Sequence, residues 1–174
     1  MIFVQMQGMM CALIPIILVE SLLVRRSLSL TYRDAFRGIT IANLASTIVG
    51  VPLAWLAMLI LQYAIMLPVA AAANYWHWQL DSPVFGVLGF LVSIAWLWPS
   101  ERYLFWMIPA ASALLLIPSF VASVWLERSI CTNSWTNQHQ AAVRRSVFNA
   151  NLLSYGLLFL IACGWLAFRC FTHS

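Results

Sequence analysis

Long apolar segments separated by short polar stretches dominate this chain. Segments 2–24, 38–73, 103–126 and 146–168 are each long enough to cross a bilayer, for which a helix needs about 20 apolar residues. A shorter apolar segment, 83–99, ends with tryptophans next to polar and charged residues. The pattern predicts an all-α integral membrane protein with four transmembrane helices plus a short re-entrant or interfacial segment. Five transmembrane helices are the alternative.

The second of these segments is too long for one straight span. It has no charged residue over 36 positions, which corresponds to about 54 Å of helix against a hydrocarbon core of roughly 30 Å. Pro52 and Pro68 are places where such a helix would bend or end, so we expect a tilted span to about Leu67. Thr31, three residues before Asp34, predicts that the helix begins ahead of the span with a capping contact.

The distribution of arginine favours the four-span arrangement. The chain has nine arginines and no lysine, and most of them lie in the polar stretches 25–37 and 128–145. Basic residues accumulate on the cytoplasmic side, and the two stretches lie on one side only if 83–99 does not cross. We therefore expect both arginine-rich loops to be cytoplasmic and to contact anionic lipids. A nucleic-acid partner is excluded because no soluble basic face is predicted.

Composition leaves little room for an extramembrane domain or for reactive chemistry. Hydrophobic residues make up 63% of the 174 positions, against about 45–50% in soluble domains, so 1–174 is interpreted as a single membrane domain. The four cysteines and three histidines form no spacing typical of a metal site or a disulfide scaffold. No nucleophile or phosphate-binding motif is present. We expect no catalytic site, metal or cofactor, and an enzyme is disfavoured.

The chain contains a weak internal repeat. The pattern R-x4-A-N-L-x-S occurs twice, 108 residues apart, and each copy follows a helix that ends near an acid, Glu20 or Glu127. The repeated positions include Arg37 and Arg145, Asn43 and Asn151, and Ser46 and Ser154. The match predicts duplicated hairpins over 1–67 and 103–168, joined by 68–102. A coincidence between two apolar helices of similar composition is the alternative.

Glu20 is the most unusual residue of the first span. An ionisable group inside an apolar helix suggests a functional site, because its burial without a partner is costly. The competing interpretation is structural, with Glu20 paired to an arginine. Arg37 is the favoured partner because a long side chain entering the second helix could reach a carboxylate at shallow depth.

A stripe of small and hydrogen-bonding residues follows in the second span. Asn43, Ser46, Thr47 and Gly50 share one helical face, and Asn151 with Ser154 begins a similar stripe in the last span. Such stripes are typical of close helix packing in membranes. A path for an ion or a polar substrate is the alternative.

Two functions remain open. The first is a non-catalytic structural or assembly subunit of a larger membrane complex, held by other membrane subunits or by self-association. The second is a small transporter or channel with a polar path at Glu20, Asn43 and Asn151. The feature that separates them is whether Glu20 faces the centre of the bundle, as a transport path would require.

Overall fold

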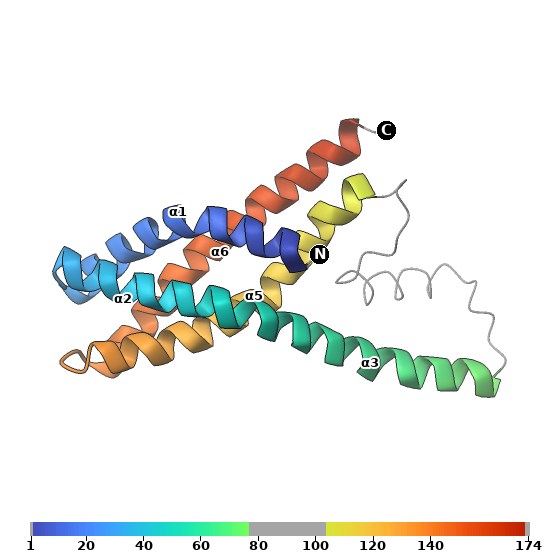
Figure 1. The fold of residues 1–174 in the computed structure, drawn as a ribbon, viewed down its shortest axis with the longest axis horizontal. Coiled ribbons are helices and arrows are strands. Elements are labelled where there is room, and N and C mark those ends of the chain that lie inside the picture. The colour runs from blue at the N-terminus through green and yellow to red at the C-terminus, as the bar shows by residue number, and fades with distance from the viewer. Residues whose placement is uncertain (1, 77–103, 173–174) are drawn as a thin grey trace.

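The computed structural model describes residues 2–76 and 104–172, and every element within these ranges is helical (Figure 1). The short apolar segment 83–99 lies outside the described residues. The described helices are α1 (Ile2–Leu28), α2 (Tyr32–Ala45), the π-helical turn η1 (Ser46–Gly50), α3 (Val51–Trp76), α5 (Leu104–Ser134) and α6 (Gln140–Thr172).

Three described stretches are long and apolar enough to cross a membrane. They are Tyr32–Ala72, Ile108–Ser134 and Gln140–Thr172. The all-helical fold and these three stretches confirm the general prediction of a helical membrane protein.

A tight reversal joins α1 to α2. Ser29 has a φ of 52°, the left-handed conformation that commonly follows the last turn of a helix. The Thr31 hydroxyl then accepts a hydrogen bond from the Asp34 backbone N–H at 3.2 Å and donates one to the Asp34 carboxylate at 2.6 Å. The capping contact predicted from the spacing of these two residues is confirmed.

The second helix is longer than predicted. α2, η1 and α3 follow one another without a break from Tyr32 to Trp76, which is about 67 Å of helix. The π-helical turn ends two residues before Pro52, whose ring clashes with the carbonyl four residues earlier in a regular α-helix. Pro68, expected to bend or end the helix, does not end it, because α3 passes through this proline. The stretch apolar enough to span a membrane extends to Ala72 rather than to about Leu67.

The second hairpin has a short turn rather than the long loop expected over 128–145. α5 extends to Ser134 and α6 begins at Gln140, so most of this arginine-rich stretch is helical. Trp135, in the turn, is buried against Gly38 of α2, where a Cβ atom would lie only 2.9 Å from the indole Cε2. The close approach of the two hairpins therefore requires glycine at position 38.

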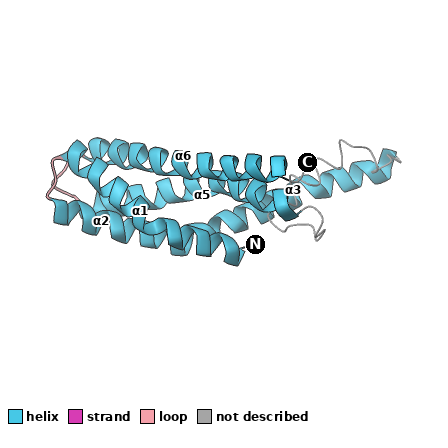
Figure 2. Cartoon of the chain, turned by 90° about the horizontal axis from the view of Figure 1, so that it is seen from above, coloured by secondary structure: helices cyan, strands magenta, loops and turns pink. Residues whose placement is uncertain are grey.

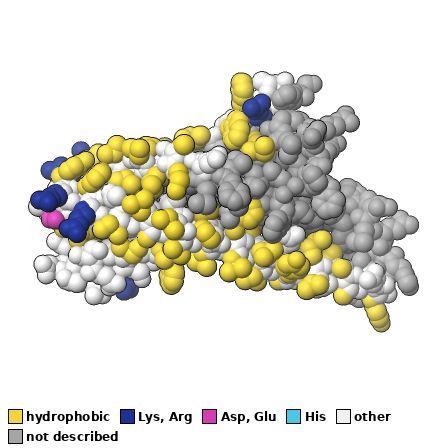
Figure 3. All heavy atoms as spheres, in the orientation of Figure 1, with side chains coloured by type: hydrophobic (Ala, Val, Ile, Leu, Met, Phe, Trp, Pro, Cys, Tyr) yellow, Lys and Arg dark blue, Asp and Glu magenta, His cyan; other side chains and the backbone are white. Residues whose placement is uncertain are grey.

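The hairpins α1–α2 and α5–α6 form one bundle with both turns at the same end (Figures 1 and 2). α1 packs on α2 and α6, while α5 packs on α6, α2 and the beginning of α3. The remainder of α3 extends away from the other helices in both views. Basic side chains gather at the turn end of the molecule, and hydrophobic side chains are spread along the described part of the visible face (Figure 3).

The interior of the bundle is layered. A turn-side apolar layer includes Ile39, Cys131 and Ala150, and a far-side apolar layer includes Val51 and Tyr155. On α6, the buried polar residues Asn151 and Ser154 lie between these two layers. On α2 and η1, the buried polar residues Asn43 and Ser46 lie between them in the same way. A polar layer is thus enclosed between two apolar ones.

Candidate functional site

Glu20 lies at the centre of this polar layer. Its side chain is 0% exposed and points from α1 toward both neighbouring helices. The Asn43 amide of α2 donates a hydrogen bond to one carboxyl oxygen at 2.7 Å, and the Ser154 hydroxyl of α6 donates to the other at 2.5 Å. Glu20 therefore faces the bundle centre, which the sequence left undecided.

Glu127 occupies the corresponding position in the second hairpin. It is 1% exposed and projects from α5. The Asn151 amide of α6 donates to one carboxyl oxygen at 2.7 Å, and the Ser46 hydroxyl at the start of η1 donates to the other at 2.8 Å. Each acid thus accepts one bond from an amide and one from a hydroxyl.

The six residues form a crossed arrangement, which we call the carboxyl cluster: Glu20, Asn43, Ser46, Glu127, Asn151 and Ser154. Each asparagine binds the acid of its own hairpin, whereas each serine binds the acid of the other hairpin. The serine contacts therefore join the two hairpins directly, in addition to their apolar packing.

Local helix geometry places each asparagine and serine in the same way. Asn43 also donates to the carbonyl oxygen of Ile39 at 3.2 Å, and Asn151 donates to that of Val147 at 3.1 Å. The hydroxyl oxygens of Ser46 and Ser154 each also lie 3.1 Å from the carbonyl oxygen of the asparagine three residues earlier. The N-x-x-S spacing puts amide and hydroxyl on one helix face, where both reach the interior.

The arginines of the repeated motif lie outside the cluster. Arg37 and Arg145 are exposed, and the expectation that Arg37 holds Glu20 is wrong, because an amide and a hydroxyl do so. The physical reason is angular: six residues separate Arg37 from Asn43, which turns Arg37 about 120° away from the face that carries the amide.

The carboxyl cluster contains two acidic side chains, and its other four members are uncharged asparagines and serines. Glu20 and Glu127 are bonded to Ser154 and Asn151, which are three residues apart on α6, so the two carboxyl groups lie in the same layer. The side chains bonded to them are uncharged. Burying two carboxyl groups without a positive partner is costly in an apolar environment. The amide oxygen of Asn151 is also buried and accepts no hydrogen bond from any described residue. Chemically, this arrangement can accept a proton or a small cation; no group of three or more His, Cys, Asp or Glu residues in the described ranges could hold a metal ion.

The predicted small-residue stripe faces the bundle interior. Thr47 and Gly50 are buried together with Asn43 and Ser46. A Cβ atom at Gly50 would lie 3.7 Å from the nearest α5 side-chain atoms, an ordinary van der Waals contact. Gly50 is therefore part of the packed face, but alanine would fit in its place.

A further buried hydrogen bond was not predicted from the sequence. The Tyr155 hydroxyl lies 2.6 Å from the Ser123 hydroxyl and donates to the Ser119 carbonyl oxygen at 3.5 Å. Ser119, Ser123 and Glu127 follow one another at intervals of four on α5, and this spacing was the available signal. The pair lies one turn beyond Glu127 and continues the polar face of α5 toward the far-side layer.

Comparison of the chain with protein families, with curated protein sequences and with solved structures finds no match. The carboxyl cluster and the surfaces of the described helices are therefore the features from which a function can be inferred.

Proposed function

We propose that this protein is a small multi-pass transporter that carries a proton or a small inorganic cation through the carboxyl cluster. The observation behind the proposal is the pair of glutamates at the bundle centre, both buried and neither bonded to a basic side chain of the described residues. This position of Glu20 favours the transport path over a purely structural role.

The free-energy cost of burying two carboxyl groups supports a functional role for the carboxyl cluster. Replacing a buried ionic group with well-packed apolar residues is often neutral or stabilising, so such groups are weak stabilisers. Two carboxyl groups close together also repel each other when both are ionised. A bound proton or cation would relieve that repulsion, and its release would restore the repulsion. A carrier site requires such reversible binding.

The layered interior supports a carrier more than an open channel. The turn-side apolar layer separates the cluster from the arginine-bearing end, and the far-side layer covers it from the other direction. Transport through such an enclosed site requires the helices to move. η1 begins at Ser46, which donates to Glu127, and π-helical turns are frequent at functional sites. We propose that this turn is where α2 and α3 flex.

A groove between α1 and α6 offers an approach from the side. It has a volume of about 140 Å³, is lined by apolar residues including Pro15 and Ile16, and reaches Ser154 of the cluster. Pro15 interrupts the hydrogen-bond ladder of α1 just before Glu20. A small outward movement of this part of α1 would connect the groove with the carboxyl group.

For topology we propose four membrane crossings, with both hairpin turns in the cytoplasm. The turns share one end of the bundle (Figure 1), and basic side chains gather there (Figure 3), which fits the cytoplasmic excess of arginine in membrane proteins. In this arrangement α1 is one crossing, and the stretches Tyr32–Ala72, Ile108–Ser134 and Gln140–Thr172 are the other three.

We also propose that the two hairpins are duplicated copies of one unit. The crossed hydrogen bonds support the duplication, since the same residue types make the same contacts in both halves. Asparagine and acid are 23 residues apart in the first hairpin and 24 in the second. Parallel repeats about an axis along the membrane normal occur in known transporters.

The transport proposal is tested in liposomes containing the purified protein and a pH-sensitive dye. An imposed cation gradient or membrane potential should produce a proton or cation flux, and removing sodium or potassium in turn identifies the ion. Glu20→Gln and Glu127→Gln should each reduce flux to the level of protein-free liposomes while the protein is produced in normal yield. Asp34→Asn is the matched control, because Asp34 is an exposed acid at the hairpin turn. Wild-type flux in both Gln variants would overturn the proposal.

A second candidate is a structural subunit of a larger membrane complex, and α3 favours it. No described side chain from 56 to 75 is classed as buried, and this part of the helix extends beyond the bundle (Figure 2). The part of this long apolar helix that extends beyond the other described helices is a candidate surface for another subunit or a second copy.

This second candidate is tested by size analysis in mild detergent. Ile60→Ala with Leu67→Ala shortens two exposed side chains of α3, and Leu160→Ala with Ile161→Ala does the same on α6. We expect the α3 pair to reduce a larger assembly to a smaller one and the α6 pair to leave it intact. A wild-type protein that is monomeric and carries no other chain from native membranes would contradict this candidate.

A further inference from the structure

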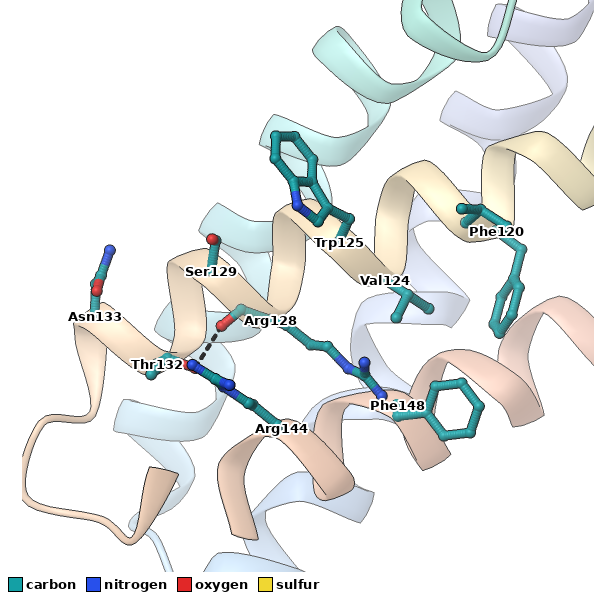
Figure 4. Close-up of a pocket in the computed structure, with 10 residues that line it drawn as sticks. Phe120, Val124, Trp125, Arg128, Ser129, Thr132, Asn133, Arg144 and Phe148 are labelled. Atoms are coloured by element: carbon teal, nitrogen blue, oxygen red, sulfur yellow. Dashed lines mark hydrogen bonds between the residues drawn. The ribbon is translucent and has the colours of Figure 1, made fainter. Parts of the chain in front are cut away.

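A groove runs between α5 and α6 on the outer surface of the second hairpin (Figure 4). It has a volume of about 580 Å³. At the turn end its walls are polar and basic, with Arg128, Thr132 and Arg144; farther along, they are apolar, with Phe120 and Val124. The groove is therefore amphipathic along its length.

Both arginines extend into this groove from opposite sides. Arg128 reaches from α5 toward α6 and places its guanidinium carbon 4.8 Å from the centre of the Phe148 ring, while Arg144 extends from α6 toward the end of α5 (Figure 4). The Nε atom of Arg128 is buried and has no hydrogen-bond partner in the part of the chain that the structure describes. Among the described residues, none that lines the groove is acidic. Two positive charges thus face a groove to which no described residue contributes a negative charge.

The apolar part of the groove continues onto an exposed hydrophobic stripe. Ile117, Val121 and Trp125, four residues apart on α5, are 57%, 62% and 64% exposed. Val121 and Trp125 also line the groove. In a helix that crosses the bilayer, such a stripe contacts lipid, and a tryptophan near the basic end is typical of the membrane surface.

We propose that this groove is a binding site for one anionic phospholipid. Its phosphate lies between the guanidinium groups of Arg128 and Arg144, and one acyl chain lies along Phe120, Val121 and Val124. A free phosphate would use only the basic end and leave the apolar walls uncovered. A lipid with a negatively charged headgroup matches both ends, and basic pockets between transmembrane helices are known to hold such headgroups. The site lies outside the carboxyl cluster and does not depend on the transport proposal.

Native mass spectrometry of the detergent-purified full chain tests the site. Phosphatidylglycerol and phosphatidylcholine with the same acyl chains are added separately, and inorganic phosphate is added as a competitor. We expect one retained phosphatidylglycerol per chain, weaker retention of phosphatidylcholine and no competition by phosphate. Arg128→Gln and Arg144→Gln should each weaken phosphatidylglycerol binding about fivefold, and the double variant about thirtyfold.

Two further variants make the result specific. Arg145→Gln removes the same charge from the neighbouring, exposed position of α6 and should bind phosphatidylglycerol like the wild type. Val121→Trp leaves both arginines in place but fills the apolar part of the groove from an exposed position, so lipid retention should fall without loss of folding. Equal retention of both lipids, equal weakening by Arg145→Gln, or full displacement by phosphate would each overturn the proposal.

Discussion

The crossed hydrogen bonds of the carboxyl cluster predict an unusual pattern of energetic coupling. Ser154 is bonded to Glu20 of the other hairpin, and Ser46 is bonded to Glu127 of the other hairpin. We consider Ser154→Ala and Ser46→Ala, each combined with Glu20→Met or Glu127→Met, as four double-mutant cycles. Methionine retains most of the side-chain volume but accepts no strong hydrogen bond, so each cycle isolates one contact.

The expected magnitudes follow from the environment of these contacts. Hydrogen bonds between membrane helices contribute about 0.6 kcal/mol on average and up to about 1.7 kcal/mol, and bonds to charged groups lie at the upper end. Ser154 and its acceptor are buried, so water does not replace the lost hydroxyl. We expect a coupling of about 1–1.7 kcal/mol for each crossed pair. The same-hairpin pairs, Ser154 with Glu127 and Ser46 with Glu20, should couple by less than about 0.5 kcal/mol.

Reversible unfolding in mixed detergent micelles measures these couplings. The buried indoles of Trp55 and Trp135 change environment when the helices separate, so tryptophan fluorescence follows the transition. Larger coupling in the same-hairpin pairs than in the crossed pairs would refute the arrangement. Equal coupling in all four cycles would show that the serines act on the cluster as a whole and would refute the specific contacts.

Three other predictions concern the turn end. Gly38→Ala should lower the free energy of unfolding by about 1–3 kcal/mol, because the new Cβ atom displaces the Trp135 ring; an unchanged unfolding midpoint would contradict the close contact. Ser29→Gly should raise stability by about 1 kcal/mol in the same assay, because glycine adopts the observed positive φ without the cost of a Cβ; a loss of stability would argue against that turn. In a chain without its native cysteines, cysteines introduced at the exposed positions Ser29 and Asn137 should both escape a membrane-impermeant thiol reagent in intact cells and react after lysis. Labelling of only one of them before lysis would place the two turns on opposite sides.

Much of the fold is encoded in local sequence. Apolar length and the scarcity of charge were sufficient to predict membrane helices, since any long apolar segment must satisfy its backbone within a helix. The start of α2 was also predictable, because the contact between Thr31 and Asp34 lies within one turn. Helix ends were less predictable: Pro68 lies inside α3, and the arginine-rich stretch 128–145 is mostly helical, because a proline or a charge ends a helix only where the surroundings favour a turn.

The candidate site was identified residue by residue, but its contacts were decided by tertiary structure. Composition and spacing singled out Glu20, Asn43 and Asn151, because buried polar residues are rare in an apolar chain. They pointed to Arg37 as the partner of Glu20, since a long basic side chain entering the second helix could reach a buried carboxylate across the hairpin. Ser154 lies 134 residues from Glu20, and no periodicity along the chain records which helices become neighbours. Only the packing of the two hairpins turns each serine toward the acid of the other hairpin and directs the arginines outward.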